Sequence, residues 1–120
     1  MKLILLQEQW QYGGWTPKPT LGPLDPPQYA MVDDEDYEAL LQFEWYVIRD
    51  NVNSYGSARA LVEFEHGAHT VTRVTTMQRV VMSRHVGQLN GAVYHRNRNL
   101  LDNQFKNLTF KRKAVVVRSA

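Results

Sequence analysis

All five prolines of this chain lie between residues 17 and 27, just after the pair Gly13-Gly14. Proline lacks the amide proton and biases the residue before it towards extended geometry. We therefore expect residues 12–28 to form a loop or an extended arm after a first strand at Lys2–Leu6. Trp10 and Trp15 lie in or beside this arm. Aromatic side chains there either pin the arm to the core or form a partner-binding surface.

The chain after the arm alternates β-branched and aromatic runs with two helical segments. The first helix is expected to begin near Asp33–Asp36, where Asp33 or Asp34 caps it and the other carboxylates favour its positive end. The second covers Thr76–Arg84, with Met77, Val80 and Val81 on one face. The expected strands are Tyr29–Val32, Phe43–Arg49, Ser57–Phe64, His69–Val74 and Ala92–Tyr94. The three middle strands, with turns at 51–56 and 66–67, predict an antiparallel meander and hence an α+β fold.

Composition limits the class of protein. The chain has 120 residues and no cysteine, which excludes disulfides, thiolate metal sites and a cysteine nucleophile. No run approaches the ~18 apolar residues of a membrane span, so we expect a cytoplasmic protein. We expect one domain over 1–120, made of an N-terminal strand (1–11), the arm (12–28), a β meander with helices (29–86) and a C-terminal motif with a basic tail (87–120).

The charge of the chain divides sharply between its two halves. Residues 1–66 carry four basic and eleven acidic side chains, whereas residues 67–120 carry ten basic and one acidic. The net charges are therefore −7 and +9. This asymmetry indicates a polyanionic partner for the basic half, or else mutual attraction of the two halves within the fold.

The segment from His95 to Leu108 carries the most informative motif. It reads H-x-N-x-N-x-x-D-N-x-x-x-N-L and directly follows a predicted strand. Asparagine and aspartate bond readily to nearby backbone groups, so they can lock a loop and hold the flanking histidine in one orientation. A histidine at the end of a strand, titrating near neutrality, can deprotonate a water molecule.

This segment resembles the HNH (ββα-metal) endonucleases of phages and mobile elements. Four further motifs occur upstream in the order typical of that family: AMVDDEDYE at 30–38, WY at 45–46, YGSA at 55–58 and MQR at 77–79. The resemblance implies a ββα motif in which His95 is the general base and Asn107 is a structural residue that holds the loop. Asn103 is a further candidate site residue. The family also uses Mg²⁺ or another divalent cation.

The chain departs from the family at the metal-binding positions. Tyr94 stands where the family has an aspartate, Val116 stands where a second ligand is expected, and Gln78 replaces a histidine. Divalent cations of this kind prefer oxygen ligands, which a valine lacks and a neutral tyrosine supplies poorly. The run at 115–117 favours a strand rather than the third, helical element of the motif. We therefore expect no metal site and no cofactor in a non-cleaving remnant.

The leading functional hypothesis is a degenerate, non-cleaving HNH-like protein that binds nucleic acid. We expect DNA, rather than RNA, to be the partner. The candidate phosphate contacts are Arg96, Arg98, Lys106, Lys111, Arg112, Lys113 and Arg118.

The remaining aromatic and histidine residues are expected to have structural roles or none. Phe105 and Phe110 should anchor the core, and His66 and His69 should be exposed. His85 should lie near the negative end of a helix, where a cation is favoured.

Two alternatives remain open. One is an active metal-dependent endonuclease with His95 as base. The other is a phage inhibitor of a host defence complex, of the anti-CRISPR or anti-restriction type, built on the same scaffold. Its acidic first half would face a basic surface of the target, and Trp10 and Trp15 would anchor the contact.

Overall fold

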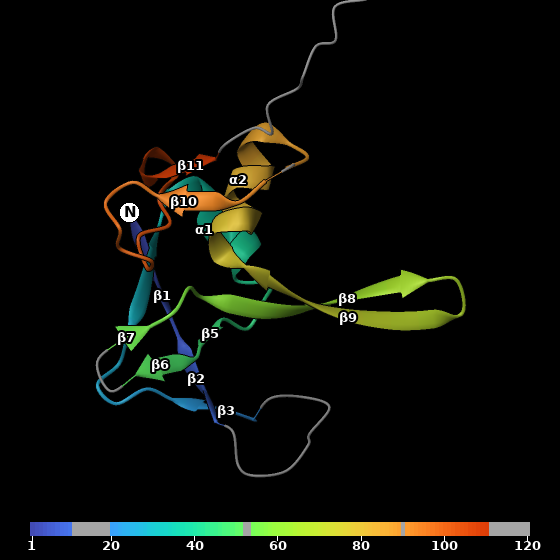
Figure 1. The fold of residues 1–120 in the computed structure, drawn as a ribbon, viewed down its shortest axis with the longest axis horizontal. Coiled ribbons are helices and arrows are strands. Elements are labelled where there is room, and N and C mark those ends of the chain that lie inside the picture. The colour runs from blue at the N-terminus through green and yellow to red at the C-terminus, as the bar shows by residue number, and fades with distance from the viewer. Residues whose placement is uncertain (11–19, 52–53, 90, 111–120) are drawn as a thin grey trace, which may run out of the picture.

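The computed structural model describes residues 1–10, 20–51, 54–89 and 91–110, and it shows an α+β fold (Figure 1). The predicted fold class is therefore confirmed. In chain order the elements are β1 (Lys2–Leu5), β2 (Gln7–Trp10), β3 (Thr20–Pro23), β4 (Tyr29–Val32), α1 (Asp34–Leu40), β5 (Tyr46–Val47), β6 (Arg49–Asn51), β7 (Ser54–Tyr55), β8 (Arg59–His66), β9 (His69–Thr76), α2 (Met77–Val86), β10 (Val93–His95), a 3-10 turn η1 (Phe105–Asn107) and β11 (Leu108–Phe110).

The largest sheet has five strands in the order β3-β2-β5-β8-β9. Neighbouring strands are antiparallel except β2 and β5, which run parallel. Strands β5, β8 and β9 form the predicted antiparallel meander, which is confirmed. The last two pair over all eight residues of each strand and reach away from the helices as a long hairpin (Figure 1).

The first strand of the meander is shorter than predicted. Of the expected strand at 43–49, only Tyr46–Val47 pair in the large sheet. Arg49–Asn51 pair instead with Ser54–Tyr55 in a separate two-stranded sheet. Before the strand the chain turns away from α1: the carbonyl of Leu40 accepts from the amide of Phe43 at 3.2 Å and from Trp45 Nε1 at 2.7 Å.

The N-terminal predictions need two corrections. The expected strand at Lys2–Leu6 is present as β1, but the N-terminal segment does not form one strand, because β2 begins after Leu6 and belongs to a different sheet. The proline-rich arm is not wholly irregular, since Thr20–Pro23 pair with β2 as strand β3. An edge strand tolerates proline because one side of its backbone has no partner to lose. The rest of the arm up to residue 19, including Trp15, lies outside the described residues.

Strand β4 and the two helices lie close to their predicted positions. β4 covers the expected residues Tyr29–Val32 and pairs with β1. Helix α2 begins one residue later and ends two residues later than predicted, and Met77 and Val81 are buried as expected, whereas Val80 is partly buried. The core joins side chains from both ends of the described chain, from Ile4 to Leu108. In the part of the chain that the structure describes, no helix is long and apolar enough to cross a membrane.

Candidate functional site

The HNH-like segment forms a β-hairpin that encloses a long, well-bonded loop. β10 pairs antiparallel with β11, and His95, the last residue of β10, lies opposite Leu108 (Figure 1). The ββα motif that the resemblance implies would begin with such a pair of strands. The third element and the run at 115–117 lie outside the described residues.

Asn107 is the centre of the loop's hydrogen-bond network. Its Nδ2 donates to Asn97 Oδ1 (2.9 Å) and to the carbonyl of Asp102 (2.8 Å), and its Oδ1 accepts from the amide of Asn97 (3.1 Å). Its carbonyl also accepts from the amide of Arg96 at 2.7 Å. Asn107 is 7% exposed, so these bonds are shielded from water. This geometry fits the loop-holding role that the family resemblance implies.

The side chains of Asn97, Asn99 and Asp102 also bond to the loop itself. Asn97 Oδ1 also accepts from the amide of Asn99, and Asn99 Oδ1 accepts from the amide of Leu101. Both are side-chain-to-backbone turns of the kind that asparagine favours. Arg98, between the two asparagines, has φ of 61°, in the left-handed region that non-glycine residues seldom adopt. The Asp102 carboxylate accepts from Asn97 Nδ2 (3.0 Å) and Gln104 Nε2 (2.9 Å) and is therefore already engaged.

The loop is docked on β4 and α1. The amide of Met31 donates to the carbonyl of Leu101, and the amide of Asn103 donates to the carbonyl of Met31, both at 2.8 Å. Asp33 Oδ2 accepts from the amide of Phe105, also at 2.8 Å. The predicted capping role of Asp33 is therefore wrong in part: the residue stands at the N-cap position of α1, but its side chain holds the loop instead of the helix.

Asn103 fixes the orientation of His95. Its Oδ1 lies 2.7 Å from His95 Nε2. With Asn103 Oδ1 as the acceptor, His95 Nε2 carries the proton of this bond, and Nδ1 takes no part in it. Nothing in the described residues hydrogen-bonds to Nδ1, and Asn103 itself is fully buried. The buried side chain of Asn103 therefore holds the His95 ring in one orientation.

The described residues do not complete a metal site at His95. Tyr94 precedes it on β10, is 50% exposed, and points to the opposite face of the hairpin because side chains alternate along a strand. The position of Val116 lies outside the described residues. Within the described chain, the only group of three potential ligands is elsewhere, at Glu35, Asp36 and His85.

That second cluster was not predicted. The buried carboxylate of Asp36 accepts from Arg84 Nε at 3.1 Å and lies 3.0 Å from His85 Nε2, while Glu35 Oε1 is 3.6 Å from the same nitrogen. His85 does lie in the last turn of α2, as expected, but it serves to tie this helix to α1. Because the Asp36 carboxylate already accepts a hydrogen bond from Arg84 and contacts His85, a metal would have to compete with the guanidinium for this carboxylate. No local pattern signals this cluster, since its residues are 49 positions apart in the chain.

Phe105 connects this cluster to the loop. Its ring stacks on His85, with centroids 4.1 Å apart and planes at 12°. Phe105 is 36% exposed, so the prediction that it anchors the core is wrong. Phe110 packs against the core as predicted. Gln78, which stands where the family has a histidine, is buried and donates from Nε2 to Ser57 Oγ at 3.0 Å.

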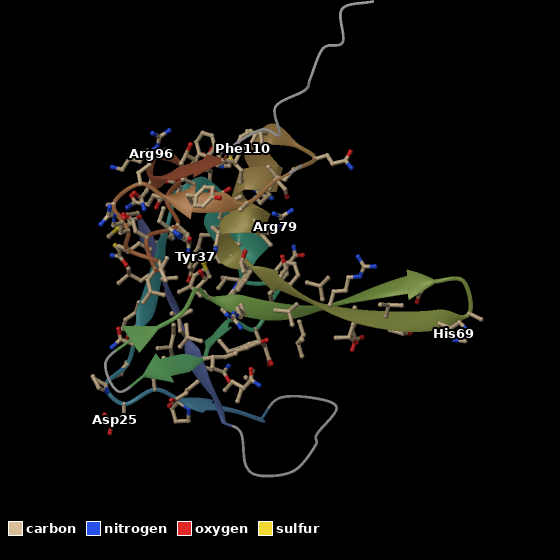
Figure 2. The ribbon with its side chains drawn as sticks, in the orientation of Figure 1. Asp25, Tyr37, His69, Arg79, Arg96 and Phe110 are labelled. Carbon is tan, nitrogen blue, oxygen red and sulfur yellow. The ribbon has the colours of Figure 1, made fainter. Side chains whose placement is uncertain are left out.

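The predicted phosphate contacts are partly described. Arg96, Arg98 and Lys106 are all exposed on the loop, and Figure 2 shows Arg96 on its outer side. Lys111, Arg112, Lys113 and Arg118 lie outside the described residues. The side chain of Trp10, at the end of β2, is not described either. His69 is exposed, as predicted, near the tip of the β8–β9 hairpin (Figure 2).

Comparisons with known proteins found no matching family model, no matching curated protein and no matching solved structure.

Proposed function

We propose that this protein binds nucleic acid, and duplex DNA in particular, through the loop between β10 and β11. The observation that carries the proposal is the charge of this loop. Arg96, Arg98 and Lys106 are exposed, whereas the single carboxylate of the segment 93–110, Asp102, is 8% exposed and bonded to Asn97 and Gln104. The loop therefore presents three cations and no exposed anion to a phosphate backbone.

The hydrogen-bond network supports this role. A charged side chain on a flexible loop loses conformational entropy when it binds, and a loop already ordered by Asn97 and Asn107 has less to lose. Arginine and lysine contacts to phosphate position a protein on DNA without reading its sequence. We therefore propose a sequence-independent interaction in the cytoplasm, and a remnant HNH-like motif that binds without cutting.

An electrophoretic mobility shift at low salt tests the proposal with single substitutions. Each phosphate contact contributes about 0.9 to the steepness of the fall of log affinity with log salt concentration. If that contribution vanishes at 1 M salt, one contact strengthens binding about eightfold at 0.1 M salt. Arg96→Gln should therefore weaken binding to a duplex by about eightfold at 0.1 M salt. Arg98→Asn, which removes the charge and tolerates the left-handed backbone, should have the same effect.

Arg73→Gln is the matched control. Arg73 is an exposed arginine on β9, in the hairpin that reaches away from the helices, and its loss changes the net charge equally. It should leave the affinity near that of the unmodified chain. If all three variants bind alike, or if the unmodified chain shifts no DNA at low salt, the proposed interface is wrong.

One observation favours a second function, metal-dependent cleavage of a phosphodiester. The bond between Asn103 Oδ1 and His95 Nε2 leaves Nδ1 free to take a proton from water. Such a histidine needs a divalent cation to stabilise the phosphate charge. We propose this activity as the alternative to binding alone.

Incubation of supercoiled plasmid with the protein and Mg²⁺ or Mn²⁺ separates the two functions. An active nuclease should nick the plasmid, His95→Ala should remove the activity, and His69→Ala, at an exposed histidine on β9, should retain it. If the unmodified chain, His95→Ala and His69→Ala all leave the plasmid intact, the cleavage function is contradicted and binding alone is the proposed function. Cutting that survives His95→Ala would show that His95 is not the base.

A further inference from the structure

A cavity of about 320 Å³ lies on the large sheet, away from the β10–β11 loop. Its walls come from β3, β5, β8, β9 and the segment that follows α1. The lining residues that matter here are Phe43, Glu44, Tyr46, Leu61, Glu63 and Thr72. This volume is at the small end of the range for ligand sites, about 300–1,000 Å³, and suits one side chain better than a large ligand.

Strand register explains why these side chains meet. Tyr46 lies opposite Arg59, and Thr72 lies opposite Glu63. Successive side chains of a strand point to opposite faces, so Arg59, Leu61 and Glu63 share the face on which Tyr46 and Thr72 lie. The cavity is therefore built on the regular part of the fold, and not on an irregular surface loop.

Two of the residues that line the cavity, Phe43 and Tyr46, are aromatic. Tyr46 is 3% exposed and brings a hydroxyl to the site. Burial raises the pKa of this phenol above its usual value of 10.0, so it remains a protonated hydrogen-bonding group at neutral pH. Phe43 adds a second ring, held edge-on against Trp45 at 5.5 Å between centroids.

The rim of the cavity is acidic. Glu44 and Glu63 are exposed and form no ion pair with any side chain in the described chain. Arg59 comes near enough for its charge to oppose the rise in the pKa of Tyr46, but it does not line the cavity. Two carboxylates above an aromatic floor attract a cation and repel phosphate, so a nucleic acid is not the partner that this site fits.

We propose that this cavity binds the side chain of an arginine presented by a protein partner. A guanidinium is planar, stacks on aromatic rings, and donates several hydrogen bonds in a fixed geometry to carboxylates. Its apolar stem would lie along Leu61, and its nitrogen atoms would reach Glu44, Glu63 and the Tyr46 hydroxyl. Lysine matches this arrangement less well, because its ammonium is a compact and strongly hydrated charge.

The test is a titration followed by ¹⁵N–¹H NMR with an acetylated, amidated glycine pentapeptide that has arginine at its centre. The neutral control peptide carries citrulline there, which keeps the shape and removes the charge. The arginine peptide should cause saturable shifts of amides at Phe43–Tyr46 and Leu61–Glu63, and the citrulline peptide should not. The loop 96–106 should not respond, which keeps this result independent of nucleic-acid binding.

Substitutions on the rim locate the interaction. Glu44→Gln and Glu63→Gln should each weaken binding by about threefold, within the range for partly exposed ion pairs. Glu65→Gln is the matched control, because Glu65 is exposed on the same face of β8 but does not line the cavity. The spectrum of each variant also reports whether it is folded.

The proposal would be overturned by equal shifts with the citrulline peptide, by an unchanged affinity in the Glu44→Gln/Glu63→Gln double variant, or by shifts centred outside the cavity. The absence of any saturable shift with the arginine peptide would overturn it as well.

Discussion

Asn107→Ala should destabilise the folded protein by about 3 kcal/mol. The substitution removes three side-chain hydrogen bonds, to the amide and the side chain of Asn97 and to the carbonyl of Asp102. Each such bond contributes about 1 kcal/mol, and a buried group left without its partner costs a similar amount or more. Urea unfolding, monitored by tryptophan fluorescence, measures the difference. Because the bonds order the loop, the affinity for DNA should fall together with the stability.

Asn99→Ala is the control for this prediction. Asn99 lies in the same loop, but it is exposed, and among the residues that the structure describes its side chain accepts one hydrogen bond, from the amide of Leu101. Its loss should cost less than about 1 kcal/mol. Equal unfolding midpoints for the two alanine variants would show that Asn107 does not hold the loop as described.

Asp36→Ala should cost about 2 kcal/mol. The carboxylate is 1% exposed and connects α1 to Arg84 and His85 of α2. Removal of one partner from a buried ion pair costs about 3–5 kcal/mol, and we expect less here because Arg84 is 41% exposed and can be solvated. The same urea unfolding experiment measures this loss of stability. Because Phe105 stacks on His85, the substitution should also loosen the packing of the loop.

Glu35→Ala provides the comparison. Glu35 is the neighbouring acid on α1, it is 68% exposed, and its carboxylate is 3.6 Å from His85 Nε2. Exposed pairs of this kind contribute about 0–1 kcal/mol. A loss of stability in Glu35→Ala as large as that in Asp36→Ala would contradict the assignment of Asp36 as the residue that joins the helices.

Much of the fold could be predicted from local patterns. β4 at Tyr29–Val32 and the three-stranded meander follow from alternation and turn residues, and both are confirmed. The errors occur where long-range contacts decide the outcome. Bonds from Phe43 and Trp45 to the Leu40 carbonyl hold the chain after α1 in a turn, and pairing with β2 makes Thr20–Pro23 a strand. Neither contact leaves a periodic signal in the sequence.

The candidate site shows the same division. The spacing of asparagines after His95 predicts a locked loop, and the structure has such a loop with Asn107 at its centre. The partner of the His95 ring, Asn103, is only eight residues away and lies in the same motif, so the sequence could single it out as a candidate site residue. Asp36 and His85 meet through the packing of two helices, so their pairing could not be predicted without the fold.

The acidic residues at the start of α1 illustrate how one motif can serve two roles. Local rules assign all four to the positive end of the helix. The structure keeps Asp34 and Glu35 exposed in the first turn, but Asp33 bonds to the amide of Phe105 and Asp36 is buried against α2. Helix-end electrostatics therefore explain only part of this run, and tertiary contacts explain the rest.

The most direct test of the proposed nucleic-acid interface is the salt dependence of DNA affinity, measured by fluorescence anisotropy between 50 and 200 mM salt. The unmodified chain should be compared with the triple variant Arg96→Gln/Arg98→Asn/Lys106→Gln. If the three cations contact phosphates, the slope of log affinity against log salt should be shallower by about 2.7 in the variant, since each contact contributes about 0.9. Equal slopes for the two proteins would contradict the account, because the loop would then carry none of the phosphate contacts.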